Sequence, residues 1–230
     1  MTNEILLVLT LIAEFSGTLL FYHFFGKTGL YIWAVVATIA ANIEVLILIN
    51  AFGIEMTLGN ILFATTFLVT DILSENYGKK AAKKAVMLST TASVCFIIIS
   101  ISWLYYIPGS KDFASESIRS VFSYTPRIMI SSLAVYVIVQ FFDVWLYHKL
   151  WNMTIRKAGN KPSFLWLRNN GATLVSQLLN TVLYNLLAFG GIYPSSTLIT
   201  IIFSGYAIFA ITSIADTPFI YLSRRIHPLE

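Results

Sequence analysis

The chain has 230 residues, of which 57% are hydrophobic and 11% charged, and its formal net charge is +4 at pH 7. A soluble domain carries roughly 25% charged residues, so this composition excludes an ordinary soluble protein and indicates a chain that lies mostly in lipid. The positive charge does not indicate a nucleic-acid partner, because Lys and Arg fall in the loops and not on one face.

Seven apolar stretches separated by short polar loops follow one another along the chain. Each is close to the ~20 residues that an α-helix needs to cross ~30 Å of hydrocarbon. No loop is long enough for a second domain. We therefore expect an all-α integral membrane protein, one polytopic domain over residues 1–230, with spans at Glu4–Phe25, Gly29–Ala51, Leu58–Tyr77, Ala82–Ile107, Pro126–Leu150, Asn169–Gly190 and Thr197–Leu222.

The placement of Lys and Arg predicts the orientation. Cytoplasmic loops are enriched in these residues. Seven spans with the N-terminus outside and the C-terminus in the cytoplasm put twelve of the fifteen bases inside and leave Lys111, Arg119 and Arg127 outside. This arrangement predicts a multi-pass protein of the plasma (inner) membrane.

Most spans carry a carboxylate or a carboxamide near the middle. A carboxylate in hydrocarbon costs roughly 2.5–3.5 kcal/mol on insertion scales, so such groups usually face the bundle interior and serve a function. The interior is acidic and rich in hydrogen-bond acceptors, which suits a solute that donates hydrogen bonds or is positively charged. The candidate substrate-binding residues are Asn42, Asp71, Gln140, Asp143, Gln177, Asn180 and Tyr184, and the candidates for coupling or gating are Glu44, Glu75, Arg127 and Asp216.

The fifth and sixth spans each place four of these polar side chains on one face. Steps of three and four residues align them along a helix. Two such stripes on consecutive antiparallel helices are expected to face a shared cavity; the alternative is simple helix packing, in which an interhelical hydrogen bond adds only ~0.6 kcal/mol on average. The stripes are Tyr136, Gln140, Asp143 and Tyr147 in one helix and Thr173, Gln177, Asn180 and Tyr184 in the next.

Asp71, Glu75 and Lys79 are four residues apart and share one face at the end of the third span. Glu75 and Lys79 are expected to form an ion pair at the membrane interface. Asp71 lies one turn deeper, so it is the better functional candidate, with a structural acid as the alternative. Near the outer side, Arg127 fits an interfacial anchor as well as a ligand. In the second span, Asn42 and Glu44 point about 200° apart and cannot both face one cavity.

An enzyme is not expected. The sequence has no phosphate-binding G-x-x-x-x-G-K-[ST] loop. His23, His148 and His227 fall at predicted interfaces or in the tail, away from the acids, which argues against metal-ligand or triad chemistry. We therefore expect no catalytic residues, no metal and no cofactor.

The run from Thr66 to Lys80 (TFLVTDILSENYGKK) resembles the signature of the vitamin uptake transporter family, also called queuosine precursor transporters. The stretches QFFDVW at 140–145 and RNNGATLVSQLLNT at 168–181 agree with it. The chain departs from the family's pattern at Asn180, where an aspartate is usual. The resemblance implies a six-helix core similar to the substrate-binding subunits of energy-coupling-factor importers, with the first span added.

The resemblance also implies import of 7-deazaguanine bases: the 7-cyano or 7-aminomethyl base, or queuine. Acids and carboxamides can read the edge of such a purine-like base, and aromatic side chains can stack on its face. A stand-alone secondary transporter is the first hypothesis. The alternative is the substrate-binding subunit of an ATP-driven importer, whose energising module would dock on small-residue faces such as Ala37 and Ala41. Both hypotheses are compatible with a homo-oligomer.

Overall fold

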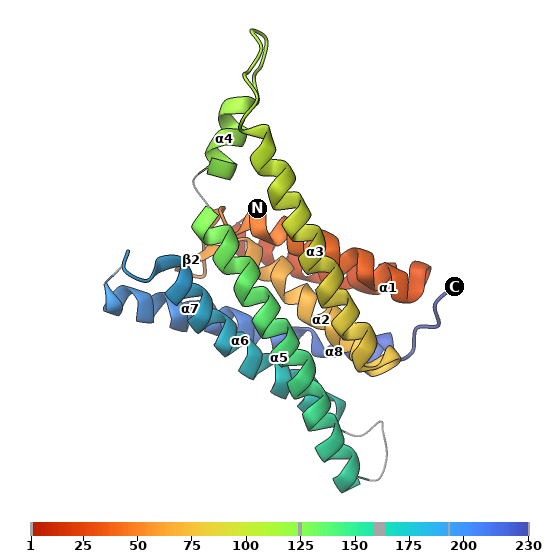
Figure 1. Cartoon of the computed structure of the whole chain (residues 1–230). Coiled ribbons are helices and arrows are strands. Elements are labelled where there is room, and N and C mark those ends of the chain that lie inside the picture. The colour runs from red at the N-terminus through yellow and green to blue at the C-terminus, as the bar shows by residue number, and fades with distance from the viewer. Residues whose placement is uncertain (1, 124–125, 159–163, 193, 230) are drawn as a thin grey trace.

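The computed structural model describes residues 2–123, 126–158, 164–192 and 194–229. It is an all-α membrane fold with one short β-hairpin (Figure 1). The helices are α1 (Asn3–Glu44), α2 (Gly59–Tyr77), α3 (Lys79–Trp103), α4 (Ser115–Ser123), α5 (Pro126–Ala158), α6 (Leu165–Phe189), α7 (Ser195–Ala215) and α8 (Thr217–Ser223), and the strands are β1 (Leu48–Ala51) and β2 (Ile54–Thr57).

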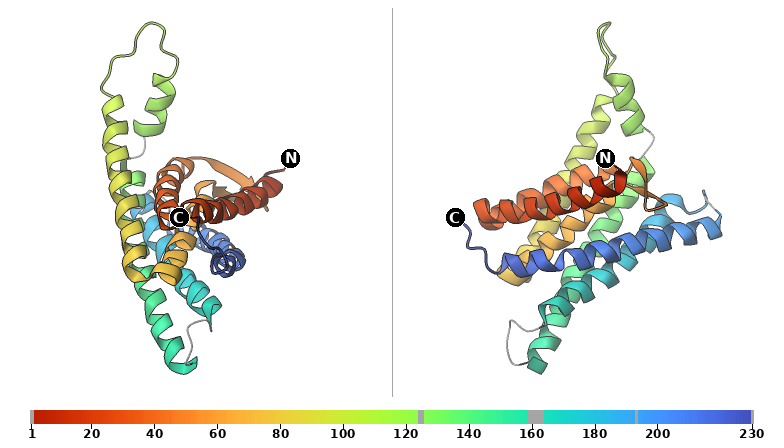
Figure 2. Two further views of the ribbon diagram at one scale, coloured as in Figure 1. Left: turned by 90° about the vertical axis from the view of Figure 1, so that its right-hand side faces the viewer. Right: turned by 180° about the vertical axis from the view of Figure 1, so that it is seen from behind.

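Helix α1 is two antiparallel arms joined by a sharp turn at Gly26. Gly26 has φ 49° and ψ −134°, a conformation that favours glycine because a Cβ would clash there. The arms pack closely, and the rings of Phe21 and Trp33 are 5.2 Å apart. The start of the first arm lies beside strand β1, which follows the second arm, and Asn3 Nδ2 donates to the carbonyl of Asn50 there at 2.9 Å. Figure 2 shows the two arms side by side.

The second predicted span is wrong at its end. It was expected to reach Ala51, but the helix stops at Glu44 and Leu48–Ala51 pairs antiparallel with Ile54–Thr57. The two-residue turn is Phe52 and Gly53, with φ of 53° and 72°. Positive φ at both central residues is what a type I′ turn requires, and that turn matches the twist of a hairpin.

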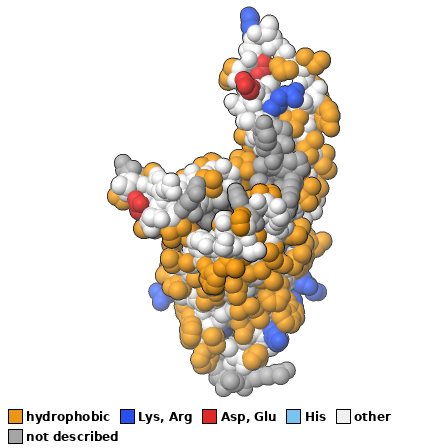
Figure 3. All heavy atoms as spheres, turned by 90° about the vertical axis from the view of Figure 1, so that its left-hand side faces the viewer, with side chains coloured by type: hydrophobic (Ala, Val, Ile, Leu, Met, Phe, Trp, Pro, Cys, Tyr) orange, Lys and Arg blue, Asp and Glu red, His pale blue; other side chains and the backbone are white. Residues whose placement is uncertain are grey.

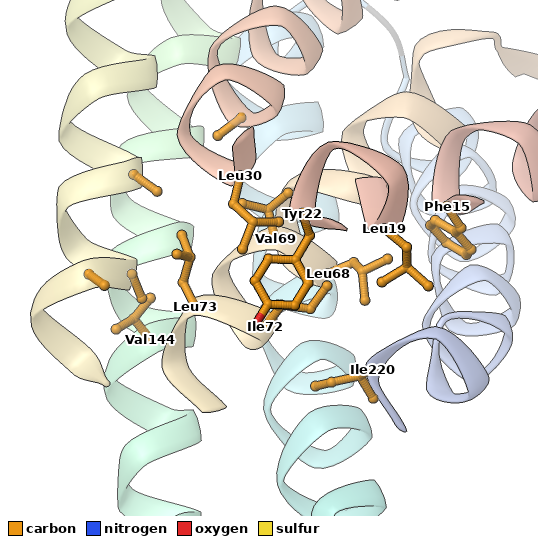
Figure 4. Packing of buried hydrophobic residues seen from close by; sticks show 14 of the residues in the cluster. Phe15, Leu19, Tyr22, Leu30, Leu68, Val69, Ile72, Leu73, Val144 and Ile220 are labelled. Atoms are coloured by element: carbon orange, nitrogen blue, oxygen red, sulfur yellow. The ribbon is translucent and has the colours of Figure 1, made fainter. Parts of the chain in front are cut away.

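Helix α2 lies at the centre of the bundle, and most of its residues are buried. Its apolar face packs with both arms of α1 and with α3, α5 and α8. Figure 4 shows this core around Leu68, Val69, Ile72 and Leu73. A buried position for α2 explains why a helix with two acids and several Thr residues can lie in a membrane protein: its neighbours shield those groups from lipid.

The face of α1 that holds Ala37 and Ala41 is covered within the chain. Both residues are buried against Leu62 of α2, and Gly59 approaches so closely that a Cβ there would lie 2.7 Å from the carbonyl of Ala41. The expectation that this face receives a partner is therefore wrong, because α2 occupies it.

Five helical segments are long and apolar enough to cross a membrane: α1, α3, most of α5, α6, and α7 with α8. Because α1 reverses at Gly26 and α2 runs through the middle, the described part of the chain passes through the bundle seven times, in agreement with the sequence. Hydrophobic side chains cover much of the face in Figure 3, as expected for a surface in contact with lipid.

Several helix ends differ from the predicted spans. α3 ends at Trp103, α4 forms within the predicted fourth loop, and α5 continues to Ala158. The last span breaks at Asp216, between α7 and α8. Pro218 follows this break, and because proline has no N–H and crowds the preceding turn, it favours interruption of the helix there.

The ends of the chain lie at opposite ends of the bundle. The first helix starts beside the β-hairpin. The C-terminal segment reaches the turn of α1, where the Leu229 N–H donates to the carbonyl of His23 at 2.9 Å. Figure 2 shows this separation. We call the hairpin end the N-terminal end of the bundle and the other the C-terminal end.

Candidate functional site

A cavity of about 370 Å³ opens at the N-terminal end of the bundle. Its volume lies in the ~300–1,000 Å³ range of small-molecule sites. It is lined by residues of the second arm of α1, the β-hairpin, α2, α5, α6 and α7. The walls that matter for recognition are aromatic rings and carboxamides: Phe63, Tyr184, Phe189 and Phe209, with Asn42, Asn60, Asn180 and Asn185.

The cavity combines flat apolar walls with a few hydrogen-bonding groups. The ring centroids of Phe63 and Phe209 are 6.0 Å apart in an edge-to-face arrangement. Asn42 Nδ2 donates to the carbonyl of Thr38 at 2.7 Å, while its buried Oδ1 has no partner among the described residues. The described lining residues include no charged side chain. Such a site suits a flat, neutral or weakly cationic ring system that donates hydrogen bonds.

Below the cavity, Gln140 and Gln177 form a second polar layer. Gln140 Nε2 donates to Thr66 Oγ1 at 2.7 Å, and Thr70 Oγ1 donates to Gln140 Oε1 at 3.3 Å. Gln140 therefore joins α5 to α2 and does not line the cavity. Gln177 is also buried, and its Oε1 has no partner among the described residues.

Three buried carboxylates form a third layer, closer to the C-terminal end. Asp71 of α2, Asp143 of α5 and Asp216 at the α7–α8 break are at most 2% exposed, and they interact electrostatically with one another. Thr173 donates to Asp71 Oδ2 at 3.3 Å, and Asn169 Nδ2 donates to Asp216 Oδ1 at 2.7 Å. We call Asp71, Asp143 and Asp216 the acid cluster.

Glu75 closes the C-terminal end of the bundle. Its carboxylate accepts hydrogen bonds from Arg168 of α6 at 2.7–3.0 Å, from Arg224 after α8 and from the Tyr147 hydroxyl of α5 at 2.7 Å. The Arg168 guanidinium also lies 4.6 Å from the centroid of the Trp151 ring. The predicted pair with Lys79 is wrong, because these tertiary partners take both carboxylate oxygens.

A shallow second cavity of about 340 Å³ lies beside this ion-pair network. Ser74, Glu75, Gly78, His148, Trp151 and Asn152 line it. The rings of His148 and Trp151 stack here at 5.7 Å. The two cavities thus lie at opposite ends of one buried polar column.

The structure separates the residues that the sequence put forward for binding. Asn42, Asn180 and Tyr184 line the cavity at the N-terminal end, whereas Asp71, Gln140, Asp143 and Gln177 lie below it. Of the gating candidates, Glu75 and Asp216 join the column. Glu44 is half-buried and does not line the cavity, as its angle to Asn42 predicts, and the side chain of Arg127 lies outside the described residues.

Sequence reasoning missed several residues of the column. Phe63, Phe209 and Asn185 contribute to the cavity, and Asn169, Arg168 and Arg224 contribute to the deeper layers. Arg168 was counted among the loop bases, yet its side chain is fully buried. Two signals were available in the sequence. Asn185 lies five residues after Asn180 on a helix already rich in carboxamides, and Arg168 and Asn169 begin the stretch 168–181 that carries the family resemblance.

Comparisons with known proteins identify relatives of this chain. Residues 57–223 match the family model described as "Putative vitamin uptake transporter". The "Probable queuosine precursor transporter" of Bacillus subtilis (strain 168) is 36% identical over 230 residues, covering 99% of this chain and 97% of that protein. No solved structure matches the chain, so the likeness to energy-coupling-factor subunits stays a prediction. The family match runs from the end of β2 to the end of α8 and includes residues of every layer of the polar column, although Asn42 and Arg224 lie outside it.

Proposed function

Because this chain belongs to the vitamin uptake transporter family, we propose that it imports 7-deazaguanine precursors of queuosine. The expected substrates are the 7-cyano base, the 7-aminomethyl base and queuine. The protein works as a stand-alone secondary transporter in the plasma membrane, with its N-terminus outside.

The cavity at the N-terminal end of the bundle is the observation that supports this substrate class. Because the proposed orientation places this end outside the cell, we call it the outer cavity. A purine-like base has two flat faces, and Phe63, Tyr184 and Phe209 supply rings against which it can pack. Its edge carries ring N–H and exocyclic amine donors, and carboxamide oxygens accept from such groups. Asn42 and Asn180 are among the residues that line the cavity. Aromatic faces with carboxamide edges match a heterocyclic base better than they match a sugar or a fatty acid.

The covered face of α1 supports a stand-alone transporter. Ala37 and Ala41 would have to be exposed to receive an energising module, but α2 buries both. The polar column with a cavity at each end also provides a route within one chain. This arrangement supports import that needs no second protein.

Uptake of a labelled precursor tests the proposal. Cells that neither make nor import the precursor would express this chain alone, and the labelled base and queuosine in tRNA would be measured. We expect both to rise, and purified protein in vesicles without ATP to take up the base. Uptake that appears only with an ATP-hydrolysing partner would favour the importer-subunit alternative.

Two variants of α6 tie uptake to the cavity. Asn180→Ala leaves a hydrogen-bonding edge of the base unpaired, which costs ~1–3 kcal/mol, or about 5–150-fold in affinity. Leu178→Ala is the matched control, since Leu178 lies on the same helix and is 45% exposed. Equal affinity in the two variants would show that the base does not bind at this wall.

A further inference from the structure

The acid cluster brings three buried carboxylates together. Asp71 and Asp143 are fully buried and Asp216 is 2% exposed. Glu75 of α2 and Tyr147 of α5 interact electrostatically with Asp71, and Arg168 of α6 interacts with Tyr147. Arg168 and Arg224 are both bound to Glu75, at 2.7 Å and 2.5 Å. The positive charge of the two guanidinium groups therefore offsets the charge of Glu75 first. Only the remaining positive charge can offset the three carboxylates of the cluster.

Few hydrogen-bond donors reach the cluster. Thr173 donates to Asp71 and Asn169 to Asp216, but both oxygens of Asp143 and Oδ1 of Asp71 have no hydrogen-bond partner within 3.5 Å among the described residues. Asn169 is anchored to Asp216 through Nδ2, so its unpartnered Oδ1 lies at the cluster as a further acceptor. The Ser176 hydroxyl, which can donate or accept, lies beside Asp143. All of these side chains are at least nine-tenths buried.

Acceptors that face each other without a donor need a proton or a cation between them. An ionised carboxylate buried without a partner costs several kcal/mol, and two carboxylates that share a site hold a proton because both cannot ionise together. A metal ion is the weaker choice here. Within the described residues, no group of three or more His, Cys, Asp or Glu side chains is arranged to hold one.

The cluster lies between the two cavities. Asp71 follows the outer-cavity residue Phe63 by eight residues of α2, or about 12 Å along the helix axis. Asn180 and Gln177 lead along α6 from the cavity toward it. On the other side, Ser74 lies three residues after Asp71 and lines the C-terminal cavity. A group held here can exchange with either side of the membrane in turn, as alternating access requires.

We propose that Asp71, Asp143 and Asp216 form the proton-binding site that couples base import to the proton gradient, an inference that rests on the proposed function. A proton enters from the outer side and neutralises one carboxylate of the cluster. With its charge reduced, the column can rearrange around the bound base. The same carboxylate then releases its proton through the C-terminal cavity to the cytoplasm, and one proton has moved inward with the base.

Vesicles that contain the purified protein and a trapped pH indicator test the coupling. With wild-type protein, we expect added 7-aminomethyl or 7-cyano base to acidify the interior, and an acidic exterior to raise the initial uptake rate several-fold. Asp71→Asn and Asp143→Asn should abolish acidification and accumulation against a gradient. Glu116→Gln is the matched control, because Glu116 is an exposed acid on α4, far from the column, and it should behave as the wild type.

Other results of the vesicle experiment would contradict either the proton site or the proposed function. Base uptake without proton movement, or uptake driven only by a sodium gradient, would overturn the proton site and leave the proposed function standing. Absence of uptake under every gradient would overturn the proposed function instead.

Infrared difference spectroscopy on the purified protein tests whether the acid cluster holds a proton, independently of any transport measurement. A protonated carboxylic-acid band at neutral pH that is reduced in Asp71→Asn or Asp143→Asn supports the site. An unchanged spectrum in both variants refutes it, whether or not either variant transports.

Discussion

Asn180 determines how much negative charge the outer cavity presents. It is 7% exposed and lines the cavity beside Tyr184, and relatives with an aspartate at this position would place an anion there. The described lining residues are otherwise uncharged. This single carboxamide therefore makes the cavity neutral, which should let it accept the 7-cyano base as readily as the cationic 7-aminomethyl base.

We expect Asn180→Asp to shift this preference toward the aminomethyl base. A hydrogen bond to a charged group contributes ~1.5–3 kcal/mol against ~0.5–1.5 kcal/mol for a neutral one. The ratio of affinities for the two bases should thus change by about 5–30-fold. Competition between labelled and unlabelled bases in uptake assays measures that ratio. A ratio equal to that of the wild type would place the aminomethyl group away from Asn180.

Glu75 is the residue that most tightly joins separate helices. It holds Tyr147, Arg168 and Arg224, and Arg168 is completely buried. Removing one partner of a buried ion pair costs ~3–5 kcal/mol, because the other charge stays buried and unpaired.

We therefore expect Glu75→Gln to lower the midpoint of thermal unfolding in detergent by at least about 6 °C, given ~2–4 °C per kcal/mol for a chain of this size. Glu116→Gln removes an exposed acid and should leave the midpoint unchanged. Intrinsic fluorescence during heating measures both. Equal midpoints would mean that the network contributes little to stability.

The long α1 depends on close approach of its own backbone at the turn. A Cβ at Gly29 would lie 2.0 Å from the carbonyl oxygen of Phe21, a distance that only a shift of the helix could relieve. Gly109, in the loop after α3, has nothing within 4 Å of such a Cβ. Substitution of either glycine by alanine adds one methyl group, but only Gly29→Ala adds it between the two arms of α1.

Gly29→Ala should reduce the amount of folded protein in the membrane severely, whereas Gly109→Ala should leave it near the wild-type level. Size-exclusion chromatography of a fluorescent fusion measures the folded fraction. A monodisperse Gly29→Ala protein at normal yield would show that the two arms can separate without loss of the fold.

The length of the apolar runs was enough to predict where the helices lie. It was not enough where contacts between segments far apart in the sequence determine the structure. The seven passes follow from ~20-residue apolar runs. The hairpin was missed because Leu48–Ala51 continues the apolar run of α1, and Phe52–Gly53 is a weak turn signal. Glu75 was paired with Lys79, four residues away, although its partners lie 93 and 149 residues away.

The candidate site shows the same division. Helical spacing correctly predicted which faces of α5 and α6 turn inward, since Tyr136, Gln140 and Asp143 are all buried. It did not predict at which depth of the bundle the cavity lies. That depth depends on how α1, α2 and α7 fill the bundle. Phe209 and Gly205 of α7 help to form the cavity, whereas Gln140 is occupied by the Thr residues of α2.

Most of the bases whose side chains the structure describes gather at one end of the bundle, and this distribution predicts the orientation of the molecule in the membrane. Lys27 at the turn of α1 lies over Tyr77, Lys84 over Tyr31 and Lys149 over Trp145. These contacts join the ends of α1, α2, α3 and α5 at the C-terminal end, where Arg168 and Arg224 also lie. Because positive residues are retained in the cytoplasm, the C-terminal end should face inward and the outer cavity should open to the exterior.

Cysteine labelling in intact cells tests this orientation. In a Cys95→Ser background, Gly109→Cys places a thiol in the loop between α3 and α4, and Lys80→Cys places one at the start of α3. A membrane-impermeant maleimide should label Gly109→Cys in intact cells but Lys80→Cys only after the cells are opened. A reporter fused after Glu230 should likewise be cytoplasmic, and one before Met1 external. The opposite labelling pattern would invert the molecule and turn the aromatic cavity toward the cytoplasm, where it would receive an exported base and not an imported one.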